Sequence, residues 1–155
     1  MNITIISVGK FKESYWREAA AEYEKRLGPY IKLTIHELIE ESFGKDDPAE
    51  ITKAKEAEKI LKHIPDRSFV IALDEHGTEF SSVGFLEFLD KKTADGTHVV
   101  FVIGGPRGLH AAILERADAT ISFSQLTFPH QMMRVFLLEQ LYRAITIMHG
   151  KSYHY

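Results

Sequence analysis

The residues best suited to chemistry gather in the last third of the chain, in the segment 121–130 (ISFSQLTFPH). Its small polar residues leave backbone N–H and C=O groups available to a ligand. We expect Pro129 at the first position of a helix, where its missing N–H would have no partner anyway. The first turn of that helix then presents His130 and Arg134, which lie four residues apart and share one face. Such a histidine can move a proton near neutral pH, although a lone helical histidine is more often an ordinary surface group.

A second loop, residues 104–108 (GGPRG), follows the apolar run 99–103. It is neither the dinucleotide-binding fingerprint nor a Walker loop, and a tight turn that needs positive φ would explain it equally well. In open α/β sheets, however, ligands bind beyond the carboxyl ends of the strands. We therefore expect the two loops to form one site, in which residues 123–128 offer backbone groups around a planar apolar ligand such as adenine.

The end of the chain carries further candidates. Glu139 and Arg143 are spaced for an ordinary ion pair between neighbouring turns of a helix. The tail 150–155 (GKSYHY) would normally be a frayed end, yet its side chains can stack on bases, bind phosphate or move protons. The chain has no cysteine, which excludes a thiolate nucleophile and cysteine-based metal sites. Motifs of metal sites and of serine hydrolases are missing too, so we expect no metal.

Composition places the chain among ordinary soluble globular proteins, with 155 residues, 45% hydrophobic and 26% charged. The length predicts a single domain over residues 1–155. No stretch reaches the roughly 18–20 apolar residues of a membrane span, and the start resembles a strand instead of a signal peptide. We expect a cytoplasmic protein without membrane contact. The net charge of −3 argues mildly against a nucleic-acid partner, although basic residues near the site can still create local positive surface.

Strand and helix patterns alternate along the chain. Strands are expected at 3–8, 32–38, 69–73, 99–103 and 119–123, and helices at about 14–27, 48–64, 82–92, 110–116 and 129–148. Asp74 to Gly77 reads as a turn, and Asp47 and either Ser81 or Ser82 as helix caps. This alternation predicts an α/β fold with a mostly parallel sheet of about five strands and helices on both faces.

The last helix is apolar nearly all round, which predicts that it is buried nearly all round. One face against the sheet leaves another that needs a cover. A second copy of the chain, in a two-fold homodimer, is the simplest cover, and loops of the same chain are the alternative.

Together these motifs resemble the RlmH family, SPOUT-class methyltransferases of large-subunit ribosomal RNA. The resemblance spans the whole chain. It rests on the order of 103–108 (IGGPRG), 126–130 (LTFPH), 134–135 (RV), 139–144 (EQLYRA) and the terminal Tyr153-His154, together with 6–10 (ISVGK) and 23–27 (YEKRL). Ser152 stands where some members have proline, and the chain ends at Tyr155 without a basic residue.

The resemblance implies a trefoil-knotted SPOUT fold, a homodimer, and S-adenosylmethionine as cofactor, with S-adenosylhomocysteine as product. It implies methylation of N3 of a pseudouridine in helix 69 of 23S rRNA on the assembled 70S ribosome. The implied cofactor-binding residues are Leu73, Gly104, Gly105, Phe123, Ser124, Gln125, Leu126, Thr127 and Phe128. The implied catalytic positions are His130, Arg143, Tyr153 and His154.

That reaction suits the residues present. An imide nitrogen must lose a weakly acidic proton, so His130 or His154 would be the base and Arg143 would stabilise the developing negative charge. Phosphate contacts are expected from a small basic set: Lys10, Lys12, Arg134, Arg143 and Lys151. Two alternatives stay open: another SPOUT methyltransferase that acts on a tRNA ribose or base, and a nucleotide-binding module without catalysis.

Overall fold

The computed structural model describes residues 1–153 of the chain. Its sheet contains five parallel strands. They are β1 (Asn2–Val8), β2 (Lys32–Leu38), β3 (Phe69–Glu79), β4 (Val99–Ile103) and β5 (Ala119–Ser122), in the order β2-β1-β4-β3-β5. The predicted α/β fold with a parallel sheet is confirmed. The threading of a trefoil knot stays a prediction.

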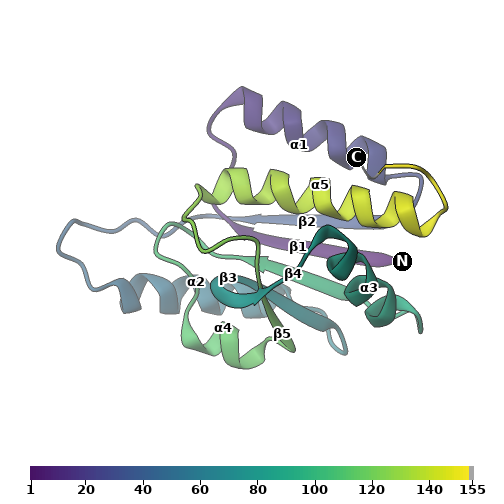
Figure 1. Cartoon of the computed structure of the whole chain (residues 1–155). Coiled ribbons are helices and arrows are strands. Elements are labelled where there is room, and N and C mark those ends of the chain that lie inside the picture. Colours follow the sequence, from purple (N-terminus) through teal and green to yellow (C-terminus); the bar gives the residue numbers. More distant parts are fainter. Residues whose placement is uncertain (154–155) are drawn as a thin grey trace.

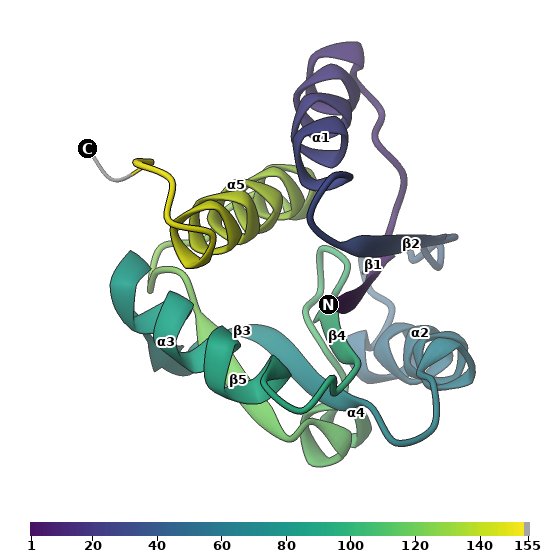
Figure 2. The ribbon, with the colours of Figure 1, turned by 90° about the vertical axis from the view of Figure 1, so that its right-hand side faces the viewer.

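Helices cover both faces of this sheet (Figures 1 and 2). One face carries α1 (Ser14–Leu27), α3 (Ser82–Thr93) and α5 (His130–Met148), and the other carries α2 (Ala49–His63) and α4 (Ala111–Arg116). A separate apolar core fills the space on each side of the sheet. All five residues of β4 are buried, as its uninterrupted apolar sequence predicts for a strand covered on both faces.

The third strand differs from its prediction. It continues to Glu79, and residues 74–77 form an excursion within it instead of a turn that ends it. Leu73 and Thr78 both align with Ile121 of β5, so the register shifts across the excursion. Gly77 lies against the β5 backbone, where an added Cβ would come within 2.5 Å of the Ile121 carbonyl carbon. Alternation of apolar residues could not show this, because the excursion is polar and exposed.

The first residues of the helices agree only in part with the predicted caps. Ser81 caps α3 by accepting a hydrogen bond from the Gly84 N–H at 3.0 Å, as expected. Asp47 does not cap α2; its carboxylate accepts from the Gly44 N–H within the preceding loop, and Pro48 takes the cap position. Pro129 likewise precedes the first helical residue, His130, so each proline stands one position earlier than predicted.

Because the strands are parallel, their carboxyl ends meet at one edge of the sheet, and α5 begins at that edge (Figure 1). The loops after β1, β2, β3, β4 and β5 therefore share one end of the molecule. Among residues 1–153 no helix combines the length and the apolar character that crossing a membrane requires.

Candidate functional site

A cavity of about 710 Å³ lies at the carboxyl edge of the sheet. This volume falls within the range of about 300–1,000 Å³ that is common for small-molecule sites. Three segments surround it: the middle of β3 at the start of its excursion, the glycine loop after β4, and the segment between β5 and α5. Eight of the nine predicted cofactor-binding residues line it: Leu73, Gly104, Gly105, Phe123, Ser124, Leu126, Thr127 and Phe128. Gln125 does not; it lies exposed in the same loop.

The glycine loop is compact because its backbone touches itself and its neighbours. Gly105 and Gly108 form an isolated antiparallel bridge, and the positive φ expected in this loop occurs at Gly108. A Cβ on Gly104 would come within 2.9 Å of the Gly108 carbonyl carbon. The loop therefore tolerates no larger residue at Gly104, and its backbone can approach a ligand closely.

The segment between β5 and α5 is held by its own serines. The Ser122 hydroxyl donates to the Ser124 carbonyl at 3.0 Å, and the Ser124 hydroxyl accepts from the Leu126 N–H at 3.0 Å. Leu126 itself is 71% exposed, an uncommon position for a large apolar side chain. Leu126 and Phe128 thus give the cavity an apolar surface, as the face of an aromatic base would require.

His130 also lines the cavity, at the first position of α5. Its Nε2 atom is buried and has no hydrogen-bond partner within residues 1–153. Burial lowers the pKa of His130, Glu40 opposes that shift, and the cations of Arg134 and Lys12 add to it. A histidine with a lowered pKa is neutral near pH 7 and can accept a proton.

Arg134, one turn further along α5, is buried rather than exposed, with 1% of its surface accessible. Its Nη1 donates to the Ser7 hydroxyl at 2.9 Å and to the Glu37 carboxylate at 2.6 Å. Its guanidinium lies 3.6 Å from the centre of the Phe11 ring. The prediction that Arg134 meets RNA phosphates is therefore wrong: this arginine joins α5 to the ends of β1 and β2.

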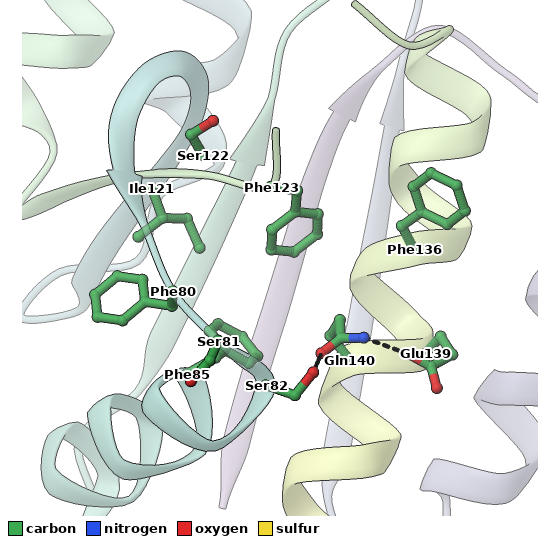
Figure 3. A pocket seen from close by; sticks show the side chains of 10 residues that line it. All are labelled: Phe80, Ser81, Ser82, Phe85, Ile121, Ser122, Phe123, Phe136, Glu139 and Gln140. Atoms are coloured by element: carbon green, nitrogen blue, oxygen red, sulfur yellow. Dashed lines mark hydrogen bonds between the residues drawn. The ribbon is translucent and has the colours of Figure 1, made fainter. Parts of the chain in front are cut away.

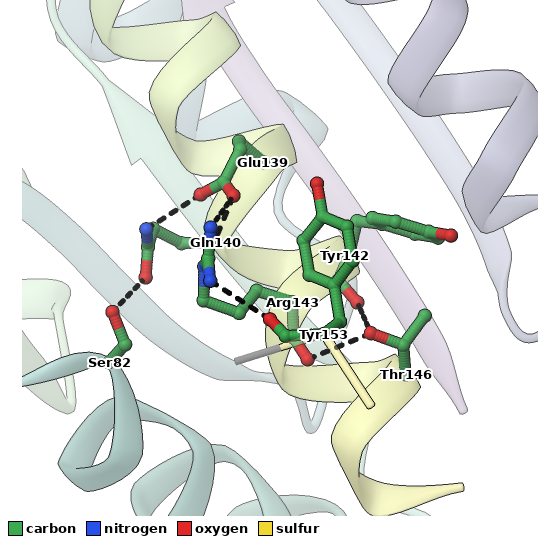
Figure 4. A network of polar contacts seen from close by, with 7 residues as sticks. All are labelled: Ser82, Glu139, Gln140, Tyr142, Arg143, Thr146 and Tyr153. Carbon is green, nitrogen blue, oxygen red and sulfur yellow. Dashed lines mark hydrogen bonds and ion pairs between the residues drawn. The ribbon is translucent and has the colours of Figure 1, made fainter. Parts of the chain in front are cut away.

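The far half of α5 holds a chain of polar contacts (Figure 4). It runs from Ser82 through Gln140 to the Glu139 carboxylate, and from there to the Arg143 guanidinium. Arg143 in turn donates to the Tyr153 carbonyl at 2.9 Å and lies 4.9 Å from the centre of its ring. The hydrogen bond that Arg143 donates to the Glu139 carboxylate raises the pKa of Arg143. The expected ion pair of Glu139 and Arg143 is present, and it holds the C-terminal segment against the helix.

The predicted catalytic residues are therefore not all together within one chain. Arg143 and Tyr153 are in contact, but His130 lies thirteen residues from Arg143 along α5. At a rise of about 1.5 Å per residue this separates them by about 20 Å. His154 falls outside the described residues.

A second cavity, of about 260 Å³, opens between α3, the end of β5 and α5 (Figure 3). Four phenylalanines line it together with three serines, and Gln140 and Glu139 of the polar chain form part of its wall. It shares Ile121, Ser122 and Phe123 with the first cavity. The two cavities therefore adjoin through the end of β5.

Several residues of the site were not predicted from the sequence. Asp74 and Glu75 line the larger cavity because the β3 excursion places them there. Arg107 also lines it, and its guanidinium lies 3.8 Å from the centre of the Phe43 ring, with hydrogen bonds to two carbonyls of the same loop, those of Gly44 and Asp47. The acidic character of 40–47 was visible in the sequence, but nothing in the pattern indicated that this loop reaches the glycine loop.

The larger cavity fits S-adenosylmethionine by its chemistry. Backbone N–H and C=O groups of 123–128 can bind an adenine edge, apolar side chains can cover its faces, and the close-packed glycine loop leaves backbone room for the rest of the ligand. Among the described residues no group of three His, Cys, Asp or Glu side chains is placed to hold a metal ion. The family model described as "Predicted SPOUT methyltransferase" matches residues 1–154, nearly the whole chain. The chain belongs to the SPOUT methyltransferase family.

Proposed function

We propose that this SPOUT methyltransferase uses S-adenosylmethionine to methylate N3 of a pseudouridine in helix 69 of 23S rRNA on the assembled 70S ribosome. The observation that carries a methyltransferase function is the cavity at the sheet edge, which three segments surround and in whose wall His130 lies. The choice of substrate is supported by the resemblance of the motifs to the RlmH family. Action on ribosomes would place the protein in the cytoplasm.

The cofactor would be held by the glycine loop and the segment 123–128, with Leu73, just before the β3 excursion, against it. When bound, it supplies a methyl group on a positively charged sulfonium. The protein's task is then to orient the pyrimidine, exclude water and remove one proton. Positioning alone is a large part of such catalysis, because it replaces an encounter with a held geometry.

We assign the proton to His130. The N3–H of a uracil-type ring is weakly acidic, and the neutral imidazole accepts its proton as N3 attacks the methyl carbon. A cation near the carbonyl oxygens stabilises the developing imidate charge. Arg143 is suited to this role only in part, because Glu139 already neutralises it within the same chain.

Bringing Arg143 and Tyr153 to His130 requires a second copy of the chain. Met132, Phe136, Glu139 and Arg143 follow one another at spacings of four, three and four residues, so they share a face of α5. Phe136 is 38% exposed in the middle of this face. If two α5 helices pack antiparallel with the two-fold axis near Phe136, the His130 end of one lies beside the Arg143 end of the other. We propose this homodimer as the active form.

The test is incubation of the protein with S-adenosylmethionine and 70S ribosomes, followed by mass spectrometry of the 23S rRNA. We expect one added methyl group in the helix 69 fragment, and little product on separated 50S subunits. Total tRNA serves as the competing substrate. Methylation of tRNA with unmodified 23S rRNA would contradict the proposed substrate and indicate a SPOUT methyltransferase that acts on tRNA. Calorimetric binding of S-adenosylmethionine without methylation of either RNA would reduce the chain to a nucleotide-binding module.

A further inference from the structure

The Nε2 atom of His130 lies in an unusual position. It points into the protein against Gly9, the residue that follows β1, and not toward a hydrogen-bond partner among residues 1–153. A Cβ on Gly9 would come within 2.7 Å of Nε2. Gly9 has a φ of +91°, so both its conformation and the space beside it favour glycine. The imidazole therefore lies directly on the backbone of this glycine.

The Glu40 carboxylate reaches the same place from the loop after β2. Its Oε2 atom lies 3.5 Å from that Cβ position, so Oε2 and the His130 Nε2 surround one point. The neighbouring carboxylates are committed elsewhere: Glu37 pairs with Arg134, and Glu41 pairs with Lys59. Among the described residues Glu40 forms no ion pair within 4.0 Å, so its carboxylate is uncommitted and lies more than 4.0 Å from the His130 Nε2, a gap that one water or a side-chain rotation would close.

Like charges also direct Glu40 toward the histidine. The buried Glu56 carboxyl group is also near Glu40, and its pKa is raised by burial first and by Glu40 in addition. Glu56 is occupied by a hydrogen bond from the Glu41 N–H at 3.1 Å. Repulsion between the two carboxylates favours turning Glu40 away from Glu56 and toward the one nearby ring that can carry a positive charge.

We propose that Glu40 is a positioning residue for His130: its carboxylate accepts the Nε2–H, directly or through one water, and so fixes the imidazole tautomer in which Nδ1 is free to accept a proton. A carboxylate that orients a histidine and stabilises the imidazolium is a recurrent arrangement in proton transfer. This role rests on the proposed function only in its catalytic part. The pairing of Glu40 with His130 is a property of the protein itself.

The pairing is tested by nuclear magnetic resonance of histidine labelled with ¹³C and ¹⁵N, with His130 identified by its loss in His130→Gln. The charged groups that face His130 are Glu40, Lys12 and Arg134. We expect Glu40→Gln to lower the pKa of His130 and to remove its preference for the Nε2–H tautomer. Glu41→Gln is the matched control, since it removes the same charge from the same loop beside Lys59, and it should leave His130 unchanged. An unaltered pKa and tautomer in Glu40→Gln would overturn the proposal.

The catalytic part is tested separately by the pH profile of methylation. Glu40→Gln should shift the acid limb of kcat/KM to lower pH and reduce the plateau rate about tenfold or more, because a base that loses its orienting partner is weaker and often in the wrong tautomer. Glu40→Asp should recover part of the rate. If the pH profile of methylation is unchanged while the pKa of His130 is altered, Glu40 pairs with His130 but plays no part in catalysis. If the wild-type protein methylates no RNA, the proposed function fails while the resonance experiment still decides the pairing.

Discussion

Arg134 shows how a single buried cation organises the start of α5. It binds Ser7 of β1 and Glu37 of β2 and stacks on Phe11, so three segments distant in sequence depend on one guanidinium. Burial lowers the pKa of Arg134, and Glu37 opposes the shift. His130 lies one turn before Arg134, so the orientation of the proposed base depends on this anchor.

We therefore predict that Arg134→Ala lowers the free energy of unfolding by about 2 kcal/mol, because the buried guanidinium is lost together with its hydrogen bonds to Ser7 and to the partly exposed Glu37 and its stacking on Phe11. Arg116→Ala is the control: it breaks a partly exposed pair with Asp118 and should cost about 0.5 kcal/mol. Urea denaturation measures both values. Equal losses in the two variants would contradict the anchoring role.

At the scale of elements, β3 contributes most of the features of the site that a regular sheet would not provide. Its excursion at 74–77 brings two carboxylates to the cavity and closes against β5 through Gly77. The segment 123–128 begins immediately after β5, so the position of that strand sets the position of one cavity wall.

We predict that Gly77→Ala destabilises the protein by about 2 kcal/mol and weakens binding of S-adenosylmethionine, because the new methyl group meets β5 backbone that cannot move independently. Gly28→Ala provides the comparison, since its Cβ would lie 3.5 Å from the Lys25 carbonyl oxygen, an ordinary contact. It should change stability by at most about 1 kcal/mol. Thermal unfolding and calorimetric titration give the two readouts; unimpaired cofactor binding in Gly77→Ala would separate the strand from the site.

At the scale of the whole molecule, the polar chain from Ser82 to Tyr153 and the cavity with His130 lie at different ends of α5. The proposed dimer would join them, and it makes a prediction that a single-chain site does not. His130→Ala and Arg143→Ala should each be nearly inactive alone. Mixed and allowed to exchange subunits, they should recover roughly a quarter of wild-type methylation, because half of the dimers are mixed and each contains one intact composite site. No recovery, with exchange shown by mass spectrometry, would contradict a site built from His130 of one chain and Arg143 of the other.

The net charge of the whole molecule affects how its proposed binding to ribosomes depends on ionic strength. With a net charge of −3, the proposed binding to ribosomes would rely on a few local cations, so we expect affinity to fall with salt along a modest slope. Lys10 and Lys12 are exposed near the His130 end of α5, where the Lys12 N–H donates to Gln131. Replacing both by alanine should reduce the slope by about two, whereas Lys62→Ala on α2 should leave it unchanged. A binding affinity that does not change with salt would contradict the prediction that these lysines contact phosphates.

The sequence by itself determined the alternation of strands and helices, the buried character of β4, and the positions of the two loops that meet at one cavity; the individual cofactor-binding residues were implied by the family resemblance. These features follow from periodicity and from where parallel strands end, which are local properties.

Only the tertiary structure decided what Arg134, Glu40 and the catalytic positions do. Helical spacing placed Arg134 beside His130 but could not show that Ser7, Glu37 and Phe11 enclose it, since those contacts join segments about a hundred residues apart. Glu40 and His130 likewise both approach Gly9 only through the packing of two loops that are distant in sequence. The separation of His130 from Arg143 follows from the length of a straight helix. Local pattern fixes which elements form, whereas burial, charge pairing and the meeting of distant loops depend on how those elements pack.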